Sequence, residues 1–598
     1  MKKILLYGFF LCLFMLPAAF AKSGSITLLT VSEGPDLLIG GTAELTLDIT
    51  PGEGHIFIDS LPLTKLDTQI STRFGNEIAC SFLEMDCSKY DFFYTIRADS
   101  SIVGGPSAGG AITVLTISLL ADIPLRNDTV MTGTINSGGL IGPVAGISKK
   151  AEAARNSGFT RILVPKFELP IMKLGNESNQ TANIMGENVT GIEIIKIANL
   201  EEALFYFTGR EFNNVSNVDI QISNEYTKKM EEVARQLCNR TSVLNSTVTI
   251  KTESNESLNV SNEKFRKGLD SLGSGDYYSA ASYCFSANLI LRQEQFADYS
   301  NSQLKDIMES LLTSINSYND KINKIALETI SDLETYMVVI ERLREAQANL
   351  ENVNTSNISA SQLAYSFERY NSAVSWSKLF GLQGTRLNLD QDYLQEACLK
   401  KISEAEERIN YVNLYVEGLS LASDDQLKEA YASFKNKNYE ICLFQASKIK
   451  AEANIVISGI TIPKDQIDSY LEEKLAATKK VILKEEGKGI FPVLGYSYYE
   501  YANSLKETDK FSALTFSEYA LEFSNLDIYF PVKSTVNADF KTRREYYFVF
   551  VYGLLVGFGF CLLLVVLNLK SAGRKAKEGM GKENIVQKRM MDRKKRKK

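Results

Sequence analysis

The 598-residue sequence contains a single histidine, His55. One histidine excludes a metal site built from several histidines, and a Ser-His-Asp or Cys-His mechanism would have to use His55. The sequence also lacks the pattern G-x-x-x-x-G-K-[ST], which argues against a P-loop ATPase. We therefore expect neither a metal site nor a cofactor.

Charge is unevenly distributed along the chain. Residues 570–598 hold 13 Lys and Arg against 3 Asp and Glu, a net charge of +10, whereas residues 22–569 carry −18. An acidic body argues against nucleic-acid binding. The length predicts two to four domains, and 44% apolar with 23% charged residues predicts that most of the chain is globular.

The N-terminus has the order of a secretory signal peptide. Lys2 and Lys3 precede an apolar run over residues 4–16, and small residues then lead to Ala21. We expect cleavage after Ala21. The alternative is an uncleaved anchor, but this run is short for a full membrane span.

A second apolar run, residues 546–567, has 22 residues and no charge. It is long enough to cross a bilayer of about 30 Å. The basic tail that follows, residues 570–598, is predicted to stay in the cytoplasm. These features predict a single-pass protein of the cell membrane with an extracytoplasmic body.

Six cysteines lie between the two apolar runs, an even number that favours disulfides in an oxidising compartment. Buried free thiols are the alternative. Spacing along the chain suggests the pairs Cys80–Cys87, Cys238–Cys284 and Cys398–Cys442.

Residues 25–210 alternate between strand and helix patterns, which predicts an α/β domain with a partly parallel sheet. Residues 239–262 contain 14 Asn, Ser or Thr and predict an exposed linker. The predicted boundaries are a signal peptide at 1–21, an α/β domain at 22–215, a helix and linker at 216–262, a helical domain at 263–540, a transmembrane helix at 546–567 and a basic tail at 570–598.

The helical domain contains three stretches that resemble tetratricopeptide hairpins. They cover residues 265–291 and 427–453, and a weaker one turns near residues 508–509. The 34-residue period is not sustained, so an irregular helical bundle is slightly preferred. An apolar stripe with 3-4-3 spacing could also support oligomers; it consists of Ile330, Leu333, Met337 and Ile340.

A glycine-rich run at residues 100–110 opens an apolar helix. Free N–H groups at a helix start can hold an oxyanion, and the Ser107 hydroxyl there could act as a nucleophile. The pattern Gly105-x-Ser107-x-Gly109 also matches the nucleophile elbow of α/β-hydrolases, but that fold needs a histidine after the serine and none follows His55. Another base is required, and lysine is the usual substitute.

Lys150 is the candidate base. It follows Ser148, a plausible N-cap, and a lysine in a first helical turn faces the positive end of the dipole, which lowers its pKa. Lys149 shares a face with Glu152 and is expected to point to solvent. Lys150 shares a face with Ala153 and is expected to point inward. The alternative is that both are ordinary surface lysines.

Three blocks resemble, in order, the proteolytic domain of Lon-type proteases: residues 105–109 (GPSAG), 131–133 (MTG) and 146–154 (GISKKAEAA). The separations of 43 positions from Ser107 to Lys150 and 25 positions from Ser107 to Thr132 are those of the family. The resemblance covers about residues 25–210, a third of the chain.

The resemblance implies a serine endopeptidase with a Ser–Lys dyad. Ser107 would attack the peptide carbonyl, Lys150 would take its proton, and Thr132 would hold the lysine ammonium. Backbone N–H groups around Pro106–Ala108 would stabilise the oxyanion. Bacterial members often carry an acidic residue where this chain has Gly104. Lon-type domains commonly assemble as six-fold rings, so the resemblance allows a homo-oligomeric ring here without fixing the number of subunits.

The preferred interpretation is an exported archaeal relative of this family that lacks the family's ATPase domain. Its fold class would be an α/β Lon-type proteolytic domain, then a mostly helical domain and a C-terminal transmembrane helix. It would cleave unfolded or extended polypeptides without ATP. The alternatives are a catalytically silent scaffold that binds peptides through the helical domain and, more remotely, a Ser–Lys amidase with a non-protein substrate.

Overall fold

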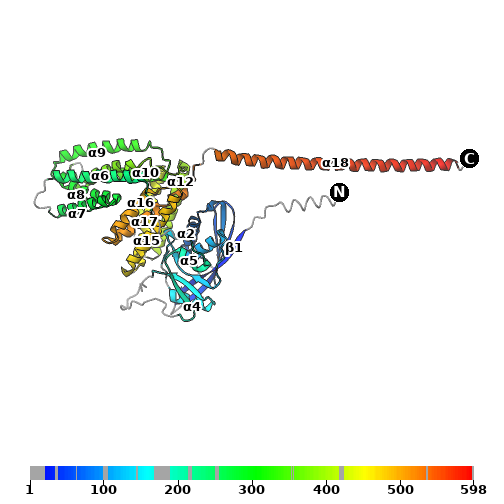
Figure 1. The fold of residues 1–598 in the computed structure, drawn as a ribbon, viewed down its shortest axis with the longest axis horizontal. Coiled ribbons are helices and arrows are strands. Elements are labelled where there is room, and N and C mark those ends of the chain that lie inside the picture. The colour runs from blue at the N-terminus through cyan, green and yellow to red at the C-terminus, as the bar shows by residue number, and fades with distance from the viewer. Residues whose placement is uncertain are drawn as a thin grey trace. The chain divides into compact units, whose positions relative to one another are not determined.

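The computed structural model forms two units, Met1–Pro531 and Val532–Lys598 (Figure 1). The predicted signal peptide, apart from Ala21, and Gly104 lie outside the described residues. The structure describes residues 21–33, 38–61, 63–98, 106–142, 144, 146–167, 189–212, 219–248, 255–351, 353, 356–415, 423–462, 464–533 and 537–595.

The first unit begins with a mixed seven-stranded sheet of order β3-β4-β2-β1-β5-β8-β9. The pairs β1–β2 and β2–β4 are antiparallel, and the remaining neighbours are parallel, as the alternation of helix and strand patterns predicts. The strands are β1 (Lys22–Glu33), β2 (Leu38–Pro51), β3 (Ile56–Leu61), β4 (Tyr90–Ala98), β5 (Thr129–Met131), β8 (Arg161–Pro165) and β9 (Glu193–Ile197).

Helices cover both faces of this sheet. Alternate residues of a strand point to opposite faces, so Met131 packs with α2 (Leu66–Leu83), α3 (Gly109–Leu120) and α5 (Leu200–Thr208), whereas its neighbour Val130 packs with α4 (Ile147–Asn156). A short hairpin of β6 (Thr134–Ile135) and β7 (Ile141–Gly142) follows β5, with the turn η3 (Ser137–Gly139) at its tip. The first turns of α3 and α4 are each bonded to the residues that follow β5, through Gly110 to Gly133 and through Lys150 to Thr132.

The rest of the first unit is mostly helical, which confirms the predicted order of an α/β part and then a helical part. The predicted hairpins are pairs of packed helices, α7–α8, α13–α14 and α16–α17. The helices are α6 (Asn224–Thr247), α7 (Asn255–Ser274), α8 (Tyr277–Ala297), α9 (Asn301–Ile322), α10 (Ile330–Glu351), α11 (Ala360–Trp376), α12 (Gln391–Tyr415), α13 (Ser423–Lys435), α14 (Tyr439–Thr461), α15 (Ile467–Gly487), α16 (Val493–Leu505) and α17 (Lys510–Phe523).

The linker predicted at residues 239–262 is wrong for the described residues. Helix α6 continues to Thr247 and α7 starts at Asn255. Thr241 and Leu244 extend the buried face of α6, so its Asn and Ser residues lie on the outer side of a packed helix. The α10 stripe expected to support oligomers is also buried, within the core of the helical region.

Three disulfides crosslink the first unit, and they join the pairs that their spacing suggests. Cys80–Cys87 joins the end of α2 to the turn η1 (Cys87–Lys89). The other two bonds, Cys238–Cys284 and Cys398–Cys442, join α6 to α8 and α12 to α14. Each long-range bond therefore staples two neighbouring helices.

Helix α15 packs the helical region against the α/β domain. The Phe167 ring meets Tyr470 edge-on, with 5.2 Å between ring centroids, and Lys166 Nζ lies 2.7 Å from Glu473 Oε1. At the tip of the β6–β7 hairpin, Gly138 faces Ala477 of α15 and Leu521 of α17. The two parts of the first unit thus share an interface that includes a common apolar cluster.

The second unit contains the helix α18 (Asn537–Lys595). The most apolar 18 residues of its segment Phe550–Arg574 have a mean hydropathy of 2.7, and among the described residues this segment is the one helical stretch long and apolar enough to cross a membrane. It overlaps the apolar run predicted at residues 546–567, and its large apolar side chains are exposed.

Candidate active site

Ser107 lies in the short turn η2 (Pro106–Ala108), directly before the buried helix α3. Its side chain is half-buried. The Gly133 N–H donates to the Ser107 carbonyl over 2.9 Å, and the Gly110 N–H donates to the Gly133 carbonyl over 3.0 Å. These two bonds tie the start of α3 to the chain that follows β5.

The sequence predicts that backbone N–H groups around Pro106–Ala108 bind the oxyanion, but not every residue of this range can donate one. Proline has no N–H group, and the Gly110 N–H is already bonded to Gly133. Ser107 and Ala108 each carry an N–H group and lie at a helix start, where N–H groups lack intrahelical partners.

Lys150 lies in the first turn of α4 and points inward, as its sequence neighbours predict. It is 4% exposed, whereas Lys149 is half-exposed and its Nζ lies 3.0 Å from Glu152 Oε2. The N-cap is Gly146, with a left-handed φ of 73°, so the interpretation of Ser148 as the cap is wrong. Glycine adopts this backbone conformation without a steric penalty.

Thr132 connects the two residues. It follows β5 and is 1% exposed. Lys150 Nζ donates to Thr132 Oγ1 over 3.1 Å, and Thr132 Oγ1 lies 3.5 Å from the carbonyl oxygen of Ser107. The amine of α4 and the backbone of the Ser107 turn are thus brought to the same hydroxyl group.

Burial sets the electrostatics of this amine. Desolvation lowers the pKa of Lys150 from 10.5 to about 8, because a charged ammonium loses its hydration in the interior. A pKa in this range leaves a substantial neutral fraction near neutral pH, which an amine needs to accept a proton.

Gly40 is a supporting residue that the sequence patterns did not reveal. A Cβ atom added at Gly40 of β2 would lie 2.0 Å from the Lys149 carbonyl oxygen and 3.2 Å from Ala153 Cβ. The backbone of α4 therefore rests directly on β2 at the turn that carries Lys150. A glycine within a strand pattern is the one sequence signal for such a close approach.

The remaining candidates have other environments. His55 Nδ1 lies 3.3 Å from Asp91 Oδ1 beside the edge strand β3, and its side chain is mostly exposed. The six cysteines are in disulfides. In the described part of the chain, no group of three or more His, Cys, Asp or Glu side chains could hold a metal ion.

Comparison with known proteins relates the residues around this site to a protein family. Residues 94–200, which contain Ser107, Thr132 and Lys150, match the family model described as the Lon protease (S16) C-terminal proteolytic domain. The chain carries a Lon-type proteolytic domain. The match runs from β4 to the start of α5, and so includes the Ser107 turn, Thr132 and the helix α4 that carries Lys150.

Relatives of the Lon-type domain occur in bacteria and archaea. A Lon protease of Phenylobacterium zucineum is 36% identical over 120 residues, which are 19% of this chain and 15% of the relative. An archaeal Lon protease of Methanocaldococcus jannaschii is 31% identical over 119 residues, 20% of this chain and 16% of the relative. An archaeal Lon protease of Pyrococcus abyssi is 28% identical over 147 residues, which are 25% of this chain and 13% of the relative. The chain thus spans about a sixth or less of the length of these relatives.

Proposed function

We propose that the chain is a serine endopeptidase that hydrolyses peptide bonds with Ser107 as nucleophile and Lys150 as general base. The observation that carries this proposal is the buried Lys150 amine, which shares the Thr132 hydroxyl with the Ser107 turn. The match of residues 94–200 to the Lon proteolytic domain, and the relatives named as Lon proteases, support it.

In the first half of the reaction, the Ser107 oxygen attacks the peptide carbonyl carbon while its proton passes to the neutral Lys150 amine. A tetrahedral oxyanion forms, and the N–H groups of Ser107 and Ala108 donate to it. Lys150 becomes an ammonium in the same step. Because both charges develop only in this step, the oxyanion and the ammonium stabilise each other chiefly in the transition state, and the lowered pKa of Lys150 supplies the neutral amine that starts it.

In the second half, the Lys150 ammonium returns its proton to the leaving amine nitrogen and the C–N bond breaks, which leaves an acyl-enzyme on Ser107. A water molecule then attacks this ester with Lys150 as base, and the proton is returned to the Ser107 oxygen. Thr132 keeps the amine oriented throughout by accepting a hydrogen bond from Nζ.

We propose further that this protease is anchored in the cell membrane by the apolar run at residues 546–567, with its body outside the cytoplasm. The length and hydropathy of the helical segment Phe550–Arg574 support the anchor. The net charge of +10 over residues 570–598 supports a cytoplasmic tail. Three disulfides in the body fit an oxidising compartment.

Because the sequence contains no P-loop pattern, the proposed enzyme works without its own ATPase, on unfolded or extended polypeptides. The helical region would present or select these substrates. Assembly into a ring remains an expectation from the family.

The test is cleavage of a loosely folded protein and a fluorogenic peptide by the full chain in detergent. Ser107→Ala and Lys150→Ala are expected to abolish cleavage, and Lys149→Ala, which changes the adjacent half-exposed lysine, is expected to retain it. Cleavage that survives in Ser107→Ala would eliminate the dyad. Peptide binding without cleavage by any variant would instead favour the silent scaffold.

A further inference from the structure

Helix α2 lies between the Ser107 turn and the helical region. On its inner face, Gly75 approaches α3 closely, because a Cβ atom added there would lie 3.0 Å from Thr113 Oγ1 and 3.2 Å from the Gly109 carbonyl oxygen. Gly109 is the first residue of α3 and directly follows the turn η2. A displacement of α2 would therefore push on the backbone beside Ser107.

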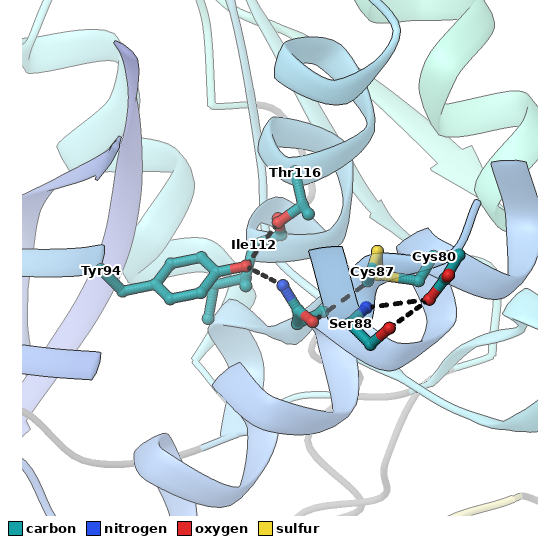
Figure 2. The surroundings of a disulfide bond; sticks show 8 residues. Cys80, Cys87, Ser88, Tyr94, Ile112 and Thr116 are labelled. Atoms are coloured by element: carbon teal, nitrogen blue, oxygen red, sulfur yellow. Dashed lines mark hydrogen bonds between the residues drawn. A yellow bond between two sulfur atoms is a disulfide. The ribbon is translucent and has the colours of Figure 1, made fainter. Parts of the chain in front are cut away.

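A buried chain of hydrogen bonds strengthens this contact (Figure 2). Asn76 Nδ2 of α2 donates to the Tyr94 hydroxyl over 3.0 Å, and that hydroxyl lies 2.8 Å from Thr116 Oγ1 of α3. The Thr116 hydroxyl in turn donates to the Ile112 carbonyl over 2.8 Å. The Cys80–Cys87 disulfide in the same view fixes the end of α2. Helices α2 and α3 are thus joined by packing and by polar contacts.

The outer face of α2 is held by cations of the helical region. The guanidinium carbon of Arg408 lies 4.7 Å from the centroid of the Phe74 ring, and Lys450 Nζ lies 5.0 Å from it. Phe74 is 8% exposed. Cation–π contacts gain strength when they are shielded from water, so these two residues hold Phe74 in place from α12 and α14.

Glu77, one turn further along α2 than Phe74, interacts electrostatically with a buried network of charges. Lys401 and Lys450 each contact Glu404 over 2.8 Å, and they lie 3.4 and 3.3 Å from Glu522. Burial, followed by the neighbouring Glu404, raises the pKa of Glu77 from 4.5 to about 7, while Lys450 and Lys401 oppose this rise. These four charges come from α12, α14 and α17, so a carboxyl group of the α/β domain interacts with charges that belong entirely to the helical region.

We propose that Phe74 and Glu77 are positioning residues, through which the helical region holds α2 and thereby sets the position of the Ser107 turn. The proposal deepens the proposed function and rests on it for its kinetic consequence. The helical region is then a structural part of the active centre rather than only a collector of substrates.

The test compares Phe74→Ala and Glu77→Gln in the full chain in detergent with wild type and with Arg73→Gln. Arg73 is an exposed residue of the same helix and serves as the matched control. Active sites are counted with a serine-reactive fluorophosphonate, so that kcat refers to folded enzyme. We expect kcat to fall about tenfold in Phe74→Ala and Glu77→Gln at pH 8.5, with KM within about twofold, because small displacements of a nucleophile are costly.

Hydrogen exchange of residues 106–120 supplies a second readout that needs no activity. Exchange in the first turn of α3 is expected to accelerate in Phe74→Ala and Glu77→Gln but not in Arg73→Gln. Wild-type exchange and wild-type kcat in both variants would overturn the proposal, as would an equal effect of Arg73→Gln. If Ser107→Ala still cleaves, the proposed function fails, and the exchange measurement still decides whether the helical region holds α2.

Discussion

Replacing Lys150 by methionine is expected to abolish cleavage and at the same time to stabilise the fold. The burial of Lys150 lowers its pKa from 10.5 to about 8, and this shift of about 2.5 units corresponds to about 3 kcal/mol. Below pH 8 the folded protein bears this penalty, because it holds an ammonium group that is better solvated in the unfolded chain. Methionine has a similar unbranched shape and no charge.

The expected net gain is somewhat smaller than the penalty. The Thr132 hydroxyl loses the donor that now lies 3.1 Å away, which offsets about 1 kcal/mol. We therefore expect Lys150→Met to raise the free energy of unfolding by about 2 kcal/mol at pH 7. As the pH rises from 8 toward 10.5, the wild-type penalty disappears, so the gain should be close to zero by about pH 9.5.

The measurement is urea unfolding of the full chain in detergent, followed by pulse proteolysis at pH 7 and pH 9.5. Lys149→Met is the matched control, because Lys149 is half-exposed and paired with Glu152, and it should change stability by less than about 1 kcal/mol. The reasoning would be refuted if Lys150→Met were less stable than wild type at pH 7, or if its gain in the free energy of unfolding did not depend on pH. Either result would mean that the buried amine does not destabilise the folded protein.

The remaining predictions concern activity. Because the neutral form of Lys150 rises from about a tenth at pH 7 to about nine tenths at pH 9, kcat/KM should increase about tenfold over this range; a flat profile would argue against a lysine base. Gly40→Ala should lower kcat at least tenfold, because its Cβ would lie 2.0 Å from the Lys149 carbonyl oxygen. Gly41→Ala, which meets only the Thr30 hydroxyl, is its control, and equal rates in the two variants would contradict this reasoning. Thr132→Val keeps the side-chain shape but removes the acceptor for Lys150, so kcat measured on the same peptide should fall by at least tenfold, and an unchanged kcat would exclude a role in orienting the amine.

Local patterns predicted those elements whose burial follows a simple period. The alternation of strand and helix patterns over residues 25–210 corresponds to the sheet and the helices that cover it, and two of the three helical hairpins turn at glycine or asparagine, one at Gly275 and the other at Asn436 and Asn438. Helix α2 gave no such signal, because its buried positions include Thr68, Thr72 and Asn76. A helix with polar groups on its packed face has no clean apolar stripe.

The linker prediction failed for a related reason. Composition alone indicates an exposed segment where Asn, Ser and Thr are frequent, yet a few apolar residues at helical spacing are enough to bury one face of α6. Tertiary packing decided the outcome there, and the adjacent Cys238–Cys284 bond lies on that packed face.

The sequence predicted the residues of the candidate site better than it predicted the contacts that hold them in place. The inward direction of Lys150 follows from its small neighbour one turn away, and the position of Ser107 follows from the start of an apolar helix. The contact between Gly40 and α4, and the contact of α2 with the helical region, join segments far apart in the chain. No local pattern encodes such pairings.

The two halves of the proposed dyad are supported by different parts of the molecule. Helix α4, which carries Lys150, packs on β1, β2 and β8 of the sheet, whereas the turn with Ser107 packs on α2, which is clamped from the helical region. Substitutions in the sheet should therefore shift the pH optimum, and substitutions in the helical region should change the turnover at that optimum. In natural or engineered variants, the pH optimum and the turnover number could therefore change almost independently of each other.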